Sequence, residues 1–367
     1  MFAARLLGKS AKKYFFPSFS RLNSSVSLDD TPRGVIVFGG AAFDSISTVT
    51  SHSLNMNASN PGVTYTGLGG VARNVAEKLC TQGTHVSLIS IVADDDAGQN
   101  IVSGLRKLGI DTSGVRILSA EGHRSARYTA IHAGDGELIV SVADMDIFTK
   151  FEPADVRALS GKITASNVVV ADANFNADTL FELANICQQL EKPFFFEPTS
   201  DHKAGRAASY IQLIDIIKPN LTELMSILAS LRKLSGVTLP ASFDRTAKAL
   251  HGNVYDAARD IPVGDVGELA MELRRLMRPD RSHASVGKHV VCSLGSRGIV
   301  WASAGGVAHV PASELRLPSL NTNGAGDALM SGLAAHVSGG GIIDLSALKA
   351  SVQLAAQHIL AQSQKLD

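Results

Sequence analysis

The feature that most constrains the fold is a regular alternation of short apolar runs with segments of helical period. The first run, Gly34 to Gly40, reads GVIVFGG and is apolar throughout, as in strands buried on both faces of a sheet. The segment VARNVAEKLCTQG then places Val71, Val75 and Leu79 four residues apart and ends at Gly83, which predicts a helix with a glycine stop. Such alternation is typical of α/β chains, so we predict a doubly wound, mostly parallel sheet flanked by helices.

The alternation continues along the chain, with one departure. Further strands and helices are expected at residues 85–92, 97–109, 167–174, 178–191, 193–200, 214–224 and 289–302. Residues 125–144 instead hold two β-rich runs around Gly134-Asp135-Gly136, which predicts a hairpin. Together with residues 45–66, this hairpin is expected to form a small β-strand lid over a site. Residues 235–285 are interpreted as an insertion near the sheet edge.

The N-terminal leader differs in composition from the rest of the chain. Residues 1–28 contain five basic side chains, many serines and no acid. This composition is typical of a mitochondrial transit peptide, and the alternative is a disordered basic tail on a cytoplasmic protein. We therefore expect residues 1–30 to lie outside a single folded domain spanning residues 31–367.

Overall composition argues against several classes of partner. The 34 basic and 34 acidic residues balance, so nothing indicates binding to nucleic acids or to a membrane surface. No apolar run reaches the roughly 18 residues of a transmembrane helix. Cys80, Cys187 and Cys292 are far apart, which fits reduced thiols packed as small apolar groups.

The stretch NTNGAGDAL, Asn321 to Leu329, carries the most specific chemistry. Gly324, Ala325 and Gly326 bring bare backbone N–H groups to the start of a helix, which is an arrangement that binds anions. Asp327 lies in the first turn of that helix. Its carboxylate can accept the proton of a hydroxyl that attacks a phosphorus atom held by these N–H groups. The alternative is an ordinary first-turn acid stabilised by the helix dipole.

Two further turns follow predicted strands toward the C-terminal half. In KPNLTEL, Asn220 and Glu223 can orient phosphate oxygens and hold Mg²⁺ through water, or can form a simple helix cap. In SLGSRG, Gly295 and Gly298 directly follow a strand. This turn can approach a nucleotide, or it can be a plain hairpin turn.

A second polar group follows the first strand. Asp44 comes after its glycine end, and Gly69, Gly70 and Asn74 open the next helix. An acid and an amide beside exposed glycine backbone suit sugar hydroxyls, because each hydroxyl both donates and accepts. The alternatives are a turn acid and a solvated amide. The acidic run Asp94–Asp96 is interpreted as a helix cap instead of a metal site.

Together these motifs resemble the ribokinase-like carbohydrate kinases of the PfkB family, over nearly the whole chain after residue 33. The resemblance implies an ATP- and Mg²⁺-dependent kinase with Asp327 as general base. It also implies that the anion hole is formed by Gly324, Ala325 and Gly326. The implied substrate-binding residues are Asp44, Gly69, Gly70 and Asn74. The implied nucleotide- and phosphate-binding residues are Asn220, Glu223, Gly295 and Gly298, and Glu223 is also implied to hold Mg²⁺ through water.

The subgroup is indicated by GGVARNVAE, by YTAIHAGDGELIVSVADMDI and by the DAN sequence of Asp172 to Asn174, which are similar to pseudouridine kinases. Val71 and Ala42 stand where many ribokinases have lysine and asparagine. The resemblance implies phosphorylation of the 5′-hydroxyl of pseudouridine, with Asp172 and Asn174 at the substrate. Related kinases for ribose, another sugar or adenosine are the alternatives, and a catalytically silent sugar- or nucleotide-binding regulator is a rival of another class.

One position departs from the family pattern. Many relatives have an aspartate that helps bind a monovalent cation where this chain has Asn321, so activation by K⁺ is left open. The resemblance also suggests a pathway link to a separate pseudouridine-5′-phosphate glycosidase. The sequence leaves the oligomeric state open, with a homodimer as the candidate.

Overall fold

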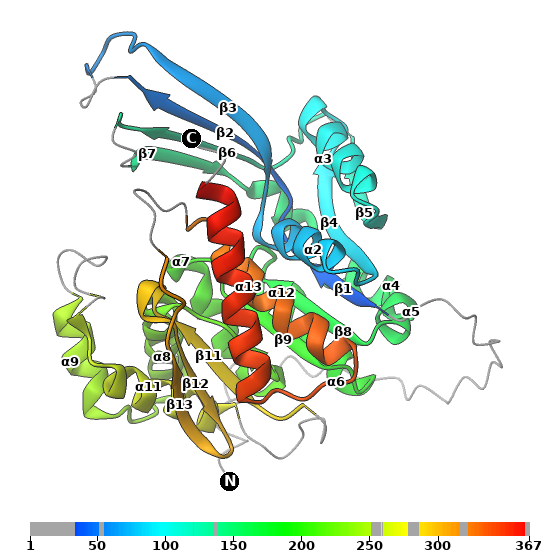
Figure 1. The fold of residues 1–367 in the computed structure, drawn as a ribbon. Coiled ribbons are helices and arrows are strands. Elements are labelled where there is room, and N and C mark those ends of the chain that lie inside the picture. The colour runs from blue at the N-terminus through cyan, green and yellow to red at the C-terminus, as the bar shows by residue number, and fades with distance from the viewer. Residues whose placement is uncertain are drawn as a thin grey trace.

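The computed structural model describes residues 34–50, 55–119, 121–134, 138–250, 258, 260–277, 286–315 and 322–363. The predicted leader, residues 1–30, lies outside this range. Two sheets are present: a large one flanked by helices, and a small one that projects beyond its end (Figure 1). Within the described residues, no helix is long and apolar enough to cross a membrane.

The large sheet confirms the predicted doubly wound, mostly parallel architecture. Its nine strands lie in the order β13-β12-β11-β10-β9-β8-β1-β4-β5, and only β12 and β13 run antiparallel to their neighbours. The bounds are β1 (Val35–Phe38), β4 (Val86–Ala93), β5 (Asp111–Leu118), β8 (Val168–Asp172), β9 (Phe194–Glu197), β10 (Ile216–Ile217), β11 (His289–Ser293), β12 (Ile299–Ser303) and β13 (Gly306–Val310).

Helices cover both faces of this sheet, which explains why its central strands β1, β8 and β9 are buried along their whole length. Side chains alternate between faces, so Val35 and Val37 of β1 join one buried cluster while Ile36 and Phe38 join the other. The first cluster includes α2 (Val71–Thr81), α3 (Asp96–Lys107), α12 (Ala325–Ser338) and α13 (Leu345–Ser363). The second includes α4 (Pro153–Ala158), α5 (Ser160–Ala165), α6 (Ala177–Gln189), α7 (Asp201–Ala204), α8 (Leu221–Ser235), α9 (Ala241–Ala249) and α11 (Val263–Leu276).

The strand order creates a crevice where ligands are expected to bind. Strand β1 pairs in parallel with β4 on one side and with β8 on the other. Connections that leave neighbouring strands in opposite directions open a gap at the carboxyl ends of those strands. The residues after β1 and β8 therefore border the candidate site.

The small sheet confirms the predicted lid. Its order is β3-β2-β6-β7, built from β2 (Ala42–Val49), β3 (Gly62–Gly69), β6 (Arg127–His132) and β7 (Leu138–Asp144). Strands β6 and β7 form the predicted antiparallel hairpin, and β6 pairs in parallel with β2. Asp135 and Gly136 of its turn lie outside the described residues. β2 follows β1 closely and β3 leads directly into α2, so the lid is joined to the crevice by short chain segments.

Hydrogen bonds and strand pairing show the local structure of three of the sequence motifs. Asp95 caps α3 by accepting the Gly98 N–H at 2.8 Å, which confirms the cap interpretation of the acidic run. Asn220 and Glu223 form a reciprocal capping box at the start of α8. The SLGSRG turn joins the antiparallel strands β11 and β12, so it is a hairpin turn. In the 235–285 segment, helix α11 packs against β11 and β12.

Candidate active site

The start of α12 has the backbone conformation that the glycine motif predicts. Gly324 is the N-cap residue and adopts a left-handed conformation with φ of 76°, which favours glycine. The Ala325 N–H donates to the Thr322 carbonyl at 3.2 Å, which closes the turn. The N–H groups of the first helical turn have no acceptor inside the helix, so those of Gly326 and Asp327 are the donors best placed for an anion.

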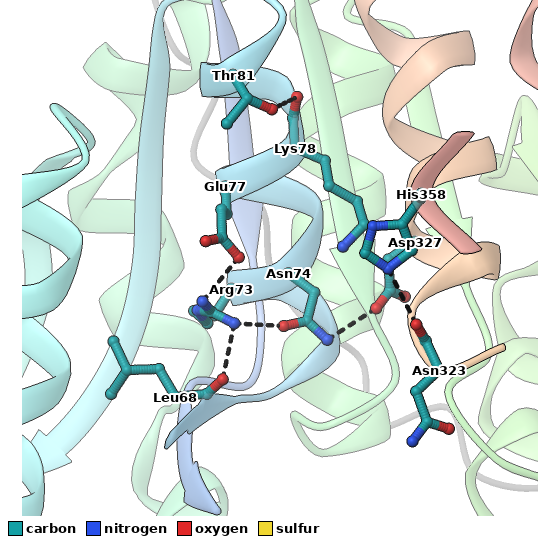
Figure 2. Close-up of polar contacts among 9 residues, drawn as sticks. All are labelled: Leu68, Arg73, Asn74, Glu77, Lys78, Thr81, Asn323, Asp327 and His358. Atoms are coloured by element: carbon teal, nitrogen blue, oxygen red, sulfur yellow. Dashed lines mark hydrogen bonds and ion pairs between the residues drawn. The ribbon is translucent and has the colours of Figure 1, made fainter. Parts of the chain in front are cut away.

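Asp327 is held by a chain of polar contacts from α2 (Figure 2). Its Oδ2 accepts a hydrogen bond from Asn74 Nδ2 at 2.8 Å. The Arg73 guanidinium donates to Asn74 Oδ1 at 2.7 Å, and it also donates to the Leu68 carbonyl and to Glu77. Because a guanidinium can only donate, it fixes the Asn74 amide with its NH₂ group toward Asp327.

Three basic side chains surround the same helix start. A methyl group placed on Gly324 would lie 3.0 Å from His358 Nε2 and 3.2 Å from Lys78 Nζ. A methyl group on Gly326 would lie 3.0 Å from Lys218 Nζ. These side chains come from α13, α2 and the end of β10, so three distant parts of the chain converge on the glycine turn. Positive charge at this point favours a bound phosphate group.

The electrostatics of the cluster are dominated by burial. Asp327 is 8% exposed, and burial raises its pKa against the Asn74 hydrogen bond and the charges of Lys78, Lys218 and His358. Burial lowers the pKa of Lys78, although the Asp327 charge opposes this shift. Burial also lowers the pKa of Lys218, but the carboxylates of Glu197 and Glu223 outweigh it and the net shift is upward.

The predicted substrate group forms where the lid joins the crevice. Asp44 lies on β2, and a methyl group on Gly69 would fall 2.0 Å from its Oδ2, so only glycine fits there. Gly70 has φ of 98°, and its Cα faces the Gly40 carbonyl too closely for any side chain. Burial raises the pKa of Asp44 to about 6, with the Arg73 charge opposing the shift. The Arg73 charge therefore acts on Asp44, while the Arg73 guanidinium itself is bonded to Asn74, the residue that donates to Asp327.

Asp172 and Asn174 lie beneath this site. The Asp172 carboxylate is 1% exposed and accepts the N–H groups of Gly40 and Ala72, each at 2.9 Å. It also accepts the backbone and side-chain N–H groups of Asn174. Lys203 Nζ donates to Asn174 Oδ1 at 2.6 Å. Both side chains are therefore engaged in joining β1, α2 and β8, and their contacts with a substrate stay a prediction.

The predicted phosphate and magnesium residues border α12 from the other side. Lys218 forms a buried ion pair with Glu197 at 2.9 Å. Glu223 is 5% exposed, and its Oε2 accepts the Asn220 N–H at 2.9 Å. Its Oε1 has no hydrogen bond within the described chain, so one carboxylate oxygen is available for Mg²⁺ through water. In the part of the chain that is described, no group of three or more acidic, histidine or cysteine side chains forms a metal cluster.

The glycines of the hairpin turn have a clear backbone role. Gly298 has φ of 88°, and a methyl group there would lie 2.1 Å from the Val310 carbonyl oxygen. Gly295 has φ of 59° and open space where its side chain would be. The turn follows the carboxyl end of β11, and its contact with a nucleotide stays a prediction. Asn321 lies outside the described residues, so its effect on cation binding stays a prediction too.

Several site residues were missed from the sequence. Lys78 follows Asn74 by four residues and therefore shares its helix face, which is a signal that the sequence contained. Lys218 immediately precedes the Pro-Asn of the KPN motif. His358 and Glu197 come from elements far from any recognised motif, so only the fold could bring them to the site.

Comparisons with known proteins identify related kinases. Residues 33–251 and 279–363 match the model of the pfkB family carbohydrate kinases. The chain is 26% identical over 301 residues to the pseudouridine kinase of Escherichia coli (strain K12), with 82% of each chain covered. It is 28% identical over 196 residues to the uncharacterized sugar kinase YeiI of the same strain, covering 53% of this chain and 51% of that protein. The chain thus spans about half the length of YeiI.

The fold has equally clear relatives among solved structures. Arabidopsis thaliana ribokinase, complexed with ribose and ATP, superposes with a TM-score of 0.68 at 15% identity. The match covers 90% of this chain and 93% of that one. With the family model matching most of the chain, and with the glycine turn, its aspartate and the lid sheet in place, this chain belongs to the pfkB family of carbohydrate kinases.

Proposed function

We propose that this chain transfers the γ-phosphoryl group of ATP to the 5′-hydroxyl of pseudouridine, with Asp327 as the general base. The observation that carries the proposal is the arrangement of Asp327. Its carboxylate lies in the first turn of α12 beside the free N–H groups, and it is oriented by Asn74. A base and an anion hole at the same point suit a hydroxyl that attacks a phosphorus atom.

The reaction then follows from the positions of the side chains. Asp44, at the junction of lid and crevice, accepts hydrogen bonds from the sugar hydroxyls. The 5′-oxygen attacks the γ-phosphorus, its proton passes to Asp327, and the bond to ADP breaks. The helix N–H groups and Lys218 stabilise the negative charge of the transferring group. When bound, Mg²⁺ would neutralise charge on the ATP phosphates, and Glu223 is the residue that would hold it through water.

The choice of pseudouridine rests on two observations. The E. coli pseudouridine kinase matches along 82% of the chain, and the GGVARNVAE segment is similar to the corresponding segment of pseudouridine kinases. The phosphate donor is proposed to be ATP because the ribokinase that shares the fold is complexed with ATP. The product, pseudouridine 5′-phosphate, is the compound on which a separate glycosidase would act.

A substrate panel tests the proposal. ADP release is measured for protein lacking residues 1–30, with ATP and Mg²⁺ and with pseudouridine, uridine, adenosine or ribose, in the presence and absence of K⁺. Turnover with pseudouridine well above the other three acceptors supports the proposal. Preference for ribose or adenosine would retain the transfer mechanism and refute the choice of substrate. No turnover with any acceptor would favour the silent regulator.

A further inference from the structure

We propose that Lys78 is a positioning residue for phosphoryl transfer: its ammonium group keeps the Asp327 carboxylate in the ionised form that accepts a proton. The inference rests on the proposed function, in which Asp327 is the base. Lys78 is expected to act through Asp327 and to keep its own protons throughout the reaction.

The geometry places the two groups near the same point of the glycine turn. Lys78 Nζ and Asp327 Oδ2 both lie within 4 Å of the point where a side-chain carbon of Gly324 would be. Figure 2 shows the Lys78 side chain extending from α2 toward the carboxylate. Asn74 precedes Lys78 by one helical turn, so the same face of α2 supplies both the hydrogen bond and the charge.

Unlike two other partly or fully buried lysines of the molecule, Lys78 is not committed to another partner. Lys218 is paired with Glu197 at 2.9 Å, and Lys203 donates to Asn174 at 2.6 Å. Within the described residues, the Lys78 ammonium makes no hydrogen bond and no ion pair. Its own helix neighbour Glu77 is already bound by Arg73 at 2.7 Å.

The position of this ammonium is unfavourable unless a negative charge lies beside it. A cation at a helix N-terminus opposes the helix dipole, which is a destabilising arrangement. Lys78 is also partly buried, which lowers its pKa and disfavours its charge further. The Asp327 carboxylate supplies the compensating charge, so the placement of Lys78 is explained by the base that it faces.

The other charged groups around Asp327 do not replace Lys78. Glu197 at the end of β9 and Glu223 on α8 are acids that oppose ionisation of Asp327. The positive charge of Lys218 is compensated in large part by these two acids, whose carboxylates raise its pKa. His358 on α13 lies 3.0 Å from the Asn323 carbonyl oxygen, so its Nε2 carries a proton and donates.

His358 adds little positive charge near neutral pH. Burial lowers its pKa, and the nearby Lys78 charge lowers it further. Lys78 is therefore the lysine in this group that no acid of the described chain holds in an ion pair. Without it, burial and the two neighbouring acids favour protonated Asp327, which cannot accept the hydroxyl proton.

The test compares pH profiles of kcat for Lys78→Met, Lys78→Arg and the wild type. Met removes the charge and keeps the unbranched side chain, whereas Arg keeps the charge. The Lys78→Met profile should lose activity on its acid side at a pH higher than wild type by about 1 pH unit or more. Lys78→Arg should restore the wild-type position. Lys233→Met, an exposed lysine at the end of α8 with no ion pair in the described chain, is the matched control for net charge.

Two further measurements make the result decisive. His358→Gln keeps a donor toward the Asn323 carbonyl but cannot titrate, so an acid limb that persists in this variant does not belong to His358. An NMR titration of protein with ¹³C-labelled Asp carboxyls, assigned with Asp327→Asn, reports the ionisation of Asp327 without turnover. If no acceptor is phosphorylated, the proposed function fails while this titration still tests Lys78. A uniform loss of kcat at every pH, or an unchanged Asp327 titration in Lys78→Met, would overturn the inference.

Discussion

The substitution Asp327→Asn separates the catalytic role of this carboxylate from any role in folding. Asparagine has nearly the same shape, and its side-chain oxygen can still accept the hydrogen bond that Asn74 donates to Asp327 at 2.8 Å. What it cannot do is accept the hydroxyl proton. General bases contribute roughly 10²–10⁴ in rate, so kcat should fall by that factor, equivalent to about 3–5 kcal/mol in the barrier. Binding of ATP should be largely unchanged.

Although Asp327→Asn should lower the rate, it should raise the stability of the folded protein at neutral pH. Burial raises the pKa of Asp327 above its unfolded value near 4, so the folded protein loses stability as pH rises from that value to the native pKa. Asparagine does not ionise and escapes this loss. The variant should therefore match wild type near pH 4 and be more stable at pH 7.

Urea unfolding at the two pH values and steady-state ADP release are the assays. Asp178→Asn is the matched control, because Asp178 is an exposed acid in the first turn of α6. A folded Asp327→Asn protein that retains turnover within tenfold of wild type would refute the assignment of the base. A loss of stability at pH 7 would refute the argument from burial.

Three other changes test the surrounding contacts. Gly69→Ala places a carbon 2.0 Å from the Asp44 carboxylate, so it should raise the KM for the acceptor and reduce stability by about 1–3 kcal/mol in urea unfolding. Because the pKa of Asp44 is about 6, acceptor KM should rise as the pH falls below 6, and the Asp44→Asn variant should show no such rise. Lys218→Met leaves Glu197 buried without its ion-pair partner, so the free energy of unfolding should fall by about 3–5 kcal/mol. The double variant that adds Glu197→Gln should recover part of this loss. Equal stabilities of the single and double variants would contradict the pairing.

The fold could be predicted because its signals are local. The apolar run before Gly39 has no polar residue to expose, so it predicted a strand buried on both faces, and β1 is such a strand. The four-residue spacing of Val75 and Leu79 predicted the buried face of α2. Asp95 was recognisable as a cap because capping joins residues close in sequence.

The site could be predicted only in part, since its contacts join distant elements. The motifs identified Asn74 and Asp327 separately, but their hydrogen bond spans 253 positions and follows from the packing of α2 against α12. His358 belongs to no motif, and α13 alone carries it to the glycine turn. The resemblance of the DAN sequence implied substrate contacts for Asp172 and Asn174, whereas the structure engages both in hydrogen bonds that join β1, α2 and β8.

The lid sheet and the body of the molecule carry different parts of the proposed site. Asp44, the proposed grip on the acceptor, belongs to strand β2 of the small sheet, whereas Asp327 belongs to the body that surrounds the large one. Selection of the acceptor and the transfer step therefore have separate structural origins. Over evolutionary time, substitutions in β2, β3, β6 and β7 can redirect such an enzyme to a new alcohol while the inherited phosphoryl-transfer apparatus stays intact.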